Sequence, residues 1–229
     1  MTESESKNPS EAKVSTSLDA HIEETGKADK MKIPSEMPVL PVRDTVVFPS
    51  MVAALSVSTE RDLKLLNHVL AGNRFLSLVA QKDKEAKVVK QSDLYNYATA
   101  AVVLQMLRMP DNSAKMLVQG IRRIRIDEYT QTEPYFKAKV TALEDTIQND
   151  METEALSRNA ADQFIRMVSM APSLPEELKI AIVNIDSPSR LADMIASHLN
   201  VSIAEKQQVL EAIDVKVRLQ KVTALITSE

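Results

Sequence analysis

The chain has 229 residues, with 28 lysines and arginines against 32 aspartates and glutamates, and a net charge of −4. It has no cysteine, which excludes disulfides and thiolate chemistry. The three glycines are Gly26, Gly72 and Gly120. A phosphate-binding P-loop needs two glycines five residues apart, and a dinucleotide-binding turn needs three close together. We therefore expect no ATP, dinucleotide or other cofactor site in these residues, and the three scattered histidines predict no metal site.

Residues 1–36 are polar and lack any hydrophobic periodicity, which predicts a disordered N-terminal extension. They have 8 acidic and 5 basic side chains, so residues 37–229 carry a net charge of only −1. The N-terminus has no apolar signal-peptide core, and its acidity argues against a mitochondrial transit peptide. Because no apolar run is long enough to span a membrane, we expect a cytoplasmic protein.

Residues 37–148 show short β-type runs separated by turn signals, which predicts a β-rich domain. The segment 109–115, "MPDNSAK", has the composition of a hairpin loop. One early helix is predicted between Thr59, a helix-capping residue, and Gly72. Many strands with one helix, and no strand–helix alternation, favour an antiparallel barrel or sandwich. The predicted strands include "TVVF", "VAALSVS", "FLSLVA", "YATAAVVLQMLRM", "AKMLVQG", "IRRIRI" and "PYFKAKVTAL".

Residues 149–229 change to helical periodicity. Ser187 followed by Pro188 is typical of a helix start, and "SIAE" at 202–205 is a capping box. The last apolar residues are spaced four, three and four apart, as in a heptad seam. We therefore predict a helical bundle that leads into a truncated, longer coiled helix. The seam residues are expected to be partly exposed and to support assembly; they are Val215, Leu219, Val222 and Ile226.

Five segments together resemble the N-terminal domain of Lon proteases. They are "LPVRDTVVFPSMV" (40–52), "LVAQKD" (78–83), "MLRMPDNSAKMLVQGIRRIRI" (106–126), "DSPSRLADMIASHL" (186–199) and "EKQQVLEAIDVKVRLQKV" (205–222). The resemblance runs from about 37 to 229 in the family's order. Two positions depart from the family's pattern: Ser50 stands where glycine is common, and Asn112 follows Asp111 where the family's hairpin usually has Asp-Gly.

The resemblance implies an α+β fold in which a PUA-like β pseudo-barrel precedes a helical bundle. In the family this module precedes an AAA+ ATPase, which uses ATP and Mg²⁺, and a serine–lysine endopeptidase. It recognises unfolded or damaged protein substrates and aids assembly of a homohexamer. These 229 residues themselves show no catalytic constellation, so we expect them to bind substrates in protein quality control without being an enzyme.

The segment "MPVLPVRDTVVFPSM" (37–51) suggests where substrates bind. We expect Pro38 and Pro41 to precede the first strand and Pro49 to end it, because sheet edges tolerate proline. The packing interpretation places Phe48 in the barrel core, and it is favoured over the functional one. In the functional interpretation an exposed apolar lip binds unfolded chains. Its candidate substrate contacts are Phe48, Pro49, Met51, Met106 and Met109.

Two alternatives remain open from the sequence. A free-standing LON-domain module would bind proteins without a protease attached. A PUA-like RNA-binding protein would use Arg122, Arg123 and Arg125 on phosphates, but the nearly neutral body and the few aromatics argue against nucleic acid. We instead expect Arg123 and Arg125 to lie on a solvated outer face of their strand.

Overall fold

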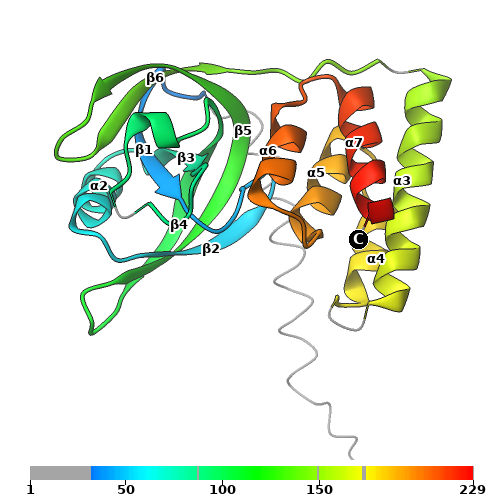
Figure 1. Cartoon of the computed structure of the whole chain (residues 1–229), viewed down its shortest axis with the longest axis horizontal. Coiled ribbons are helices and arrows are strands. Elements are labelled where there is room, and N and C mark those ends of the chain that lie inside the picture. Colours follow the sequence, from blue (N-terminus) through cyan, green and yellow to red (C-terminus); the bar gives the residue numbers. More distant parts are fainter. Residues whose placement is uncertain (1–31, 87, 149, 172–173, 229) are drawn as a thin grey trace, which may run out of the picture. The chain divides into compact units, whose positions relative to one another are not determined.

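The computed structural model describes residues 32–86, 88–148, 150–171 and 174–228 (Figure 1). The chain divides into two units between Lys32 and Ile33, and all the helices and strands named below belong to the second unit. Most of the predicted N-terminal extension, residues 1–31, lies outside the described residues. The second unit contains a β-barrel and a group of helices, which confirms the predicted α+β class.

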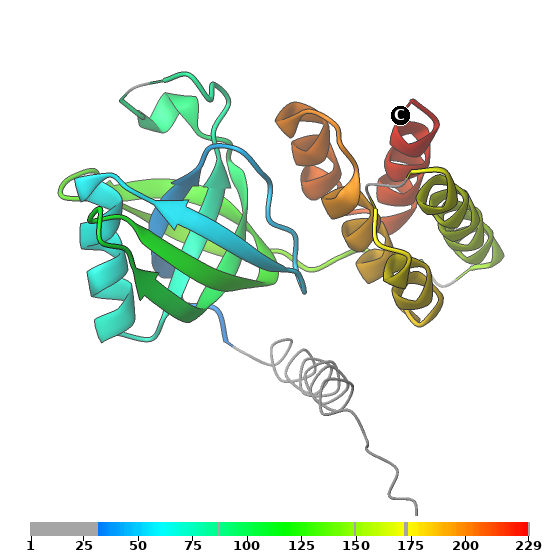
Figure 2. The ribbon, with the colours of Figure 1, turned by 90° about the horizontal axis from the view of Figure 1, so that it is seen from below.

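Six strands form one mixed sheet in the order β2-β5-β4-β3-β1-β6 (Figures 1 and 2). A further pairing between β5 and β6 closes this sheet into a barrel. Closure is possible because β5 is long: its first part pairs with β2 and β4, and its last part pairs with β6. The strands are β1 (Glu36–Val42), β2 (Val52–Val57), β3 (Phe75–Ala80), β4 (Tyr97–Arg108), β5 (Ala114–Gln131) and β6 (Phe136–Ala142).

The predicted runs "AKMLVQG" and "IRRIRI" form one continuous strand, β5. The hairpin between β4 and β5 is found where the turn residues predicted it, and Asn112 has φ of 60°. Asparagine tolerates this left-handed conformation better than most residues do. A turn that commonly contains Asp-Gly is therefore preserved with Asn112 in the second position.

Pro38 and Pro41 lie inside β1, so the prediction that they precede the first strand is wrong. Residues 36–39 of β1 pair with β6, whereas residues 39–42 pair with β3. Each half of β1 is therefore hydrogen-bonded mainly on one side. A proline, which has no amide donor, is tolerated where its nitrogen faces the unpaired side. The predicted strand "TVVF" is instead irregular in structure.

The early helix, α2 (Glu60–Ala71), begins after Thr59 and ends before Gly72, as predicted. The Thr59 hydroxyl accepts a hydrogen bond from the backbone amide of Asp62 (3.1 Å). Leu65, Leu66 and Val69 are buried against the barrel. A short 3₁₀ helix, η1 (Gln91–Asp93), lies between β3 and β4.

Within the described residues, five helices follow the barrel. The boundary predicted between 148 and 149 lies between Ala142, the end of β6, and Met151, the start of the first helix. Ser187 caps α5 with Pro188 in its first turn, and Ser202 and Glu205 form the predicted capping box of α6. The helices are α3 (Met151–Met170), α4 (Glu177–Val183), α5 (Pro188–His198), α6 (Ile203–Glu211) and α7 (Val215–Ser228).

The heptad seam of α7 is buried, so the prediction that it is partly exposed is wrong. The seam packs against the other helices as part of their shared hydrophobic core. A helix packed in a bundle buries an apolar stripe of the same spacing as a coiled-coil seam, so the spacing alone does not distinguish the two. The buried seam residues are Val215, Leu219, Val222 and Ile226.

Candidate functional site

The loop before β2 packs against the helices and so links the barrel to them. Phe48 is fully buried in the same hydrophobic cluster as the helical core, together with Val46 and Ala80. The neighbouring Val47 instead belongs to the cluster beneath α2. Phe48 is therefore buried, as the packing interpretation predicted, but it lies in the helical core rather than in the barrel core, and it is not part of an exposed lip.

Hydrogen bonds hold this loop on the barrel. The buried hydroxyl of Thr99 donates to the carbonyl oxygen of Val47 (2.6 Å). The backbone amide of Ser50 donates to the carbonyl oxygen of Gly120 (2.9 Å), and the amide of Gly120 donates to the carbonyl oxygen of Met51 (2.8 Å). Ser50 adopts φ of 61°, a conformation that costs a residue with a Cβ more than it costs glycine. These hydrogen bonds fix the later part of the loop to β4 and β5.

The loop approaches β5 so closely at Gly120 that a residue with a side chain would not fit there. A Cβ added at Gly120 would lie 2.2 Å from the Phe48 carbonyl oxygen, a backbone atom that cannot turn away. Gly120 thus lets β5 pass directly beneath the loop.

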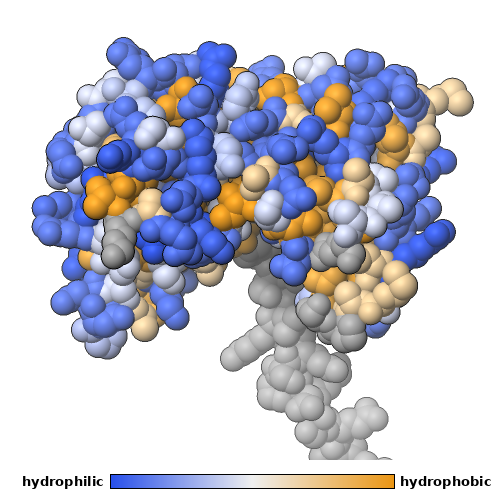
Figure 3. All heavy atoms as spheres, in the orientation of Figure 1, coloured by the Kyte–Doolittle hydropathy of each residue, from blue (hydrophilic) through white to orange (hydrophobic). Residues whose placement is uncertain are grey.

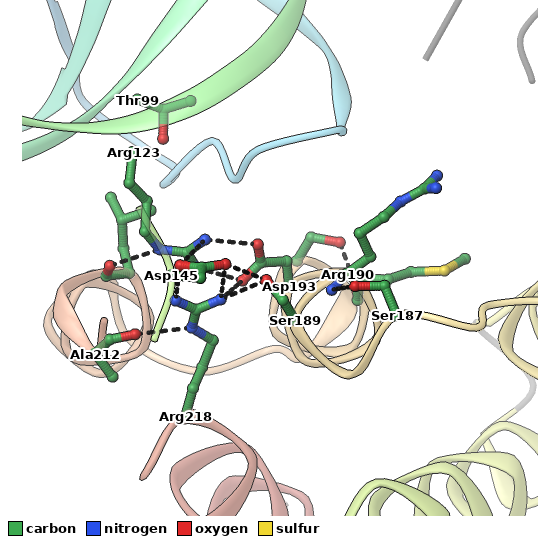
Figure 4. Close-up of polar contacts among 12 residues, drawn as sticks. Thr99, Arg123, Asp145, Ser187, Ser189, Arg190, Asp193, Ala212 and Arg218 are labelled. Carbon is green, nitrogen blue, oxygen red and sulfur yellow. Dashed lines mark hydrogen bonds and ion pairs between the residues drawn. The ribbon is translucent and has the colours of Figure 1, made fainter. Parts of the chain in front are cut away.

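A buried ion pair joins β5 to α5. The Arg123 guanidinium donates from Nη1 to Asp193 Oδ2 (2.9 Å) and from Nη2 to Asp193 Oδ1, and its Nε donates to the carbonyl oxygen of Leu210 (2.9 Å) (Figure 4). Both side chains are 3% exposed. The prediction that Arg123 lies on a solvated face is therefore wrong, whereas Arg125 on the same strand is exposed as predicted.

A second arginine extends this pair into a network. Arg218 of α7 is fully buried and donates from Nη1 and Nη2 to the two carboxylate oxygens of Asp145 (3.0 and 2.5 Å). Its Nη1 also donates to the Ser189 hydroxyl (2.8 Å), and its Nε to the Ala212 carbonyl oxygen (2.8 Å). Figure 4 shows both guanidinium groups converging on the two carboxylates. We call Arg123, Asp145, Asp193 and Arg218 the buried ion network.

The charges of the buried ion network balance, with two arginines against two aspartates. Burial raises the pKa of Asp145, but the hydrogen bonds and charges of Arg218 and Arg123 outweigh that effect and leave the pKa lowered. Burial raises the pKa of the more deeply enclosed Asp193. Both guanidinium groups of the network are hydrogen-bonded to a carboxylate, and through them the network connects the barrel to the helices.

The sequence contained a signal for this network. Arg218 lies three residues after Val215 and four before Val222, within the apolar seam of α7. Asp193 likewise lies among the buried residues of α5. A charged residue inside an apolar stripe indicates a buried partner, although periodicity does not say which residue that partner is.

The remaining candidate substrate contacts are divided between two places. Pro49 and Met51 are half-buried, and Met51 packs against the helical core. Met106 and Met109 are half-buried near the β4–β5 hairpin, where Met106 packs against the cluster beneath α2. The structure therefore does not unite the four side chains in one patch. We call Pro49 and Met51 the lip.

Exposed apolar side chains occur elsewhere on the helices. Ile180 is 67% and Val183 is 71% exposed, and their spacing places them on the same side of α4. Met170, at the end of the neighbouring α3, is 77% exposed. Figure 3 shows apolar colours gathered at the lower end of the helices, where α3 ends and α4 lies. We call Ile180 and Val183 the α4 face.

In the described part of the chain, no group of three or more side chains is placed to hold a metal ion. Within those same residues, no helix is both long and apolar enough to cross a membrane.

The fold and its junction define a class: an α+β domain in which a closed barrel is fixed to a helical bundle through one shared core and one ion network. The chain belongs to the family described as the ATP-dependent protease La (LON) substrate-binding domain. The sequence model of that family matches residues 36–228. The family resemblance inferred from the five sequence segments is thereby confirmed.

Lon proteases from several bacteria are similar to this chain. The Lon protease of Dictyoglomus thermophilum is 44% identical over 197 residues, which cover 86% of this chain and 25% of that protein. That of Escherichia coli K12 is 39% identical over 194 residues, which cover 85% of this chain and 25% of that protein. The chain thus spans about a quarter of the length of these relatives.

A solved structure confirms the fold. The N-terminal domain of the Mycobacterium avium complex Lon protease matches with a TM-score of 0.72 at 22% identity, covering 85% of this chain and 99% of that one.

Proposed function

We propose that this chain is the part of a Lon-like ATP-dependent protease that recognises unfolded or damaged proteins. The observation that carries the proposal is the family match across residues 36–228. Unfolded proteins differ from native ones by exposing apolar side chains, so their receptor needs accessible apolar surface. The lip and the α4 face supply such surface. Met51 adds a flexible side chain that adapts to different partners.

Catalysis belongs to other parts of a longer protein in this proposal. ATP and Mg²⁺ would act at an ATPase module, and peptide bonds would be cleaved at a serine–lysine site. The chain itself would contribute weak binding, and several copies in a homohexamer would raise the effective affinity for one long substrate. We also propose a cytoplasmic location. We propose no role in binding nucleic acid, because residues 37–229 carry a net charge of only −1.

The test is a titration of the chain against one fluorescently labelled protein in its native form and in a permanently unfolded variant. We expect binding of the unfolded form alone, with little loss of affinity at high salt, because salt screens charges rather than apolar contacts. Equal binding of both forms, or binding abolished by salt, would contradict the proposal.

Serine substitutions then locate the contact. Met51→Ser tests the lip, and the double variant Ile180→Ser/Val183→Ser tests the α4 face. Met151→Ser is the matched control, because Met151 is an exposed methionine at the opposite end of α3 from Met170. We expect the control to bind as the unchanged chain does, and at least one test variant to bind more weakly.

A further inference from the structure

A cleft of about 420 Å³ opens in the wall of the barrel between β2 and the end of β1. One side of the cleft is formed by residues 40–45 and the other by residues 54–59. The two sides are not paired with each other: β2 pairs with β5, and the last residues of β1 pair with β3. The cleft is therefore bordered by two open strand edges.

The backbone groups of β2 that face the cleft follow from the hydrogen bonds on its other side. In an antiparallel strand, alternate residues direct both N–H and C=O toward the same neighbour. The carbonyl oxygen of Met51 accepts a hydrogen bond from Gly120 of β5, and the register continues through Ala53 and Leu55. Ala54 and Ser56 therefore direct their amides and carbonyls away from β5, along the open edge.

The opposite side of the cleft offers acceptors. The carbonyl oxygen of Val42 accepts a hydrogen bond from the amide of Gln81, so the backbone of Val42 faces β3. By the same alternation, the carbonyl of Pro41 faces away from β3. Pairing between β1 and β6 ends at Val39, so the Pro41 carbonyl is not hydrogen-bonded to β6 by that pairing.

A buried side chain in the wall of the cleft also lacks a partner. Gln81 lines the cleft and is 4% exposed, and its Oε1 has no hydrogen-bond partner in the described structure. Leaving a buried amide oxygen unsatisfied is costly. An N–H group entering the cleft would remove that cost.

The edge of β2 lacks two of the features that protect an edge strand from pairing. Proteins usually block such edges with charged side chains, proline or a bulge. The sequence of β2, "VAALSV", has no charge and no proline, and its outward side chains at Ala54 and Ser56 are small. A second chain can therefore approach this edge closely.

We propose that an extended segment of a non-native polypeptide pairs with the open edge of β2 as an added strand, within this cleft. Its backbone would exchange hydrogen bonds with Ala54 and Ser56, and one of its amides would donate to Gln81. Recognition through the backbone is independent of sequence, and it requires an extended, unpaired chain. The start of β2 adjoins Met51, so the lip receives the apolar side chains of the same segment. This inference rests on the proposed function and specifies how that binding occurs.

The test uses a short fluorescein-labelled peptide of alternating valine and threonine, and the same peptide with N-methyl groups on alternate backbone amides. Methylation removes hydrogen-bond donors and leaves every side chain in place. We expect the methylated peptide to bind the chain about tenfold more weakly or worse, since two or more hydrogen bonds are lost. Equal affinity for the two peptides would overturn the inference.

Protein variants test the same contact from the other side. Ser56→Pro removes an outward amide of β2, whereas Ser56→Ala keeps that amide and serves as the matched control. We expect about tenfold weaker peptide binding for Ser56→Pro and unchanged binding for Ser56→Ala. Gln81→Met provides a second test in case Ser56→Pro does not fold. We expect it to bind the peptide about fivefold more weakly without loss of stability.

The outcomes separate the inference from the proposed function. If an unfolded protein binds but methylation and Gln81→Met have no effect, the strand pairing is wrong and the proposed function stands. If neither the unmethylated peptide nor the unfolded protein binds, both are wrong. Removing residues 1–31 should leave peptide binding unchanged; tighter binding without them would identify that segment as the occupant of the cleft instead.

Discussion

Arg123 on β5 and Asp193 on α5 are 70 residues apart in the sequence and form a two-pronged ion pair inside the protein. The pair connects the barrel to the helical bundle, and Phe48, in the loop before β2, also belongs to the helical core. Apolar packing and a directed ion pair thus act at one junction. Because an ion pair has a preferred geometry, it fixes the orientation of the barrel on the bundle more strictly than apolar contact does.

Removing one partner of this pair is expected to destabilise the folded protein. Arg123→Met should lower the free energy of unfolding by about 3–5 kcal/mol, because Asp193 is left buried and short of a partner. Arg125→Met is the matched control on the same strand, and we expect a change within about 0.5 kcal/mol because Arg125 is exposed. Urea unfolding followed by circular dichroism measures both. The double variant Arg123→Met/Asp193→Leu should recover much of the loss, and no recovery would contradict this explanation.

Replacing each of the two described glycines with alanine should change the stability of the protein by different amounts. At Gly120 a Cβ would meet the backbone of Phe48 at 2.2 Å, so Gly120→Ala should destabilise the protein by about 2 kcal/mol or more. At Gly72 the nearest atom would be 3.5 Å away, an ordinary contact. Gly72→Ala should therefore change the free energy of unfolding by less than about 1 kcal/mol. Thermal unfolding gives the comparison, and similar midpoints for the two variants would show that the close approach is wrong.

Replacing Ser50 with glycine should stabilise the folded protein. Its φ of 61° is unfavourable for a residue with a Cβ. Ser50→Gly should raise the free energy of unfolding by about 1 kcal/mol. Asn112→Gly, at φ of 60°, should gain less, because asparagine tolerates that conformation. A loss of stability in Ser50→Gly, measured by urea unfolding, would argue against strain at this loop.

The stability of the helical bundle should depend on pH through Asp150. Hydrogen bonds from Lys216 and from the amide and hydroxyl of Thr153 lower the pKa of this carboxyl to about 2 from 3.8. The resulting stabilisation is fully present above pH 3.8 and is lost as the pH falls through about 2. Asp150→Asn keeps the helix cap and lacks this titration. The difference in unfolding free energy between the two proteins should shrink from pH 4 toward pH 2; a constant difference would exclude this role for Asp150.

Local patterns predicted the elements that depend on local chemistry. Thr59, Ser187 and Ser202 cap helices through hydrogen bonds a few residues away, so their sequence context was sufficient. The β4–β5 hairpin was predictable for the same reason. Both departures from the family's glycine pattern, Ser50 and Asn112, are left-handed in the structure.

Long-range relationships could not be read in this way. The strand assignment of Pro38 and Pro41 depends on which side of β1 is paired, and that is decided by strands far along the chain. The seam of α7 fits a bundle core as well as a coiled coil, since both bury the same spacing. The strand pattern alone places Arg123 in solvent, because its partner, Asp193, is brought near only by the complete fold.

The central claim, that this domain recognises non-native polypeptide, is tested most directly by amide NMR of the chain during addition of an unfolded protein. We predict saturable shifts for residues 54–57 and for Met51, at low and at high salt, and none when the native form of the same protein is added. Absence of shifts with the unfolded protein, or the same shifts with its native form, would contradict the account.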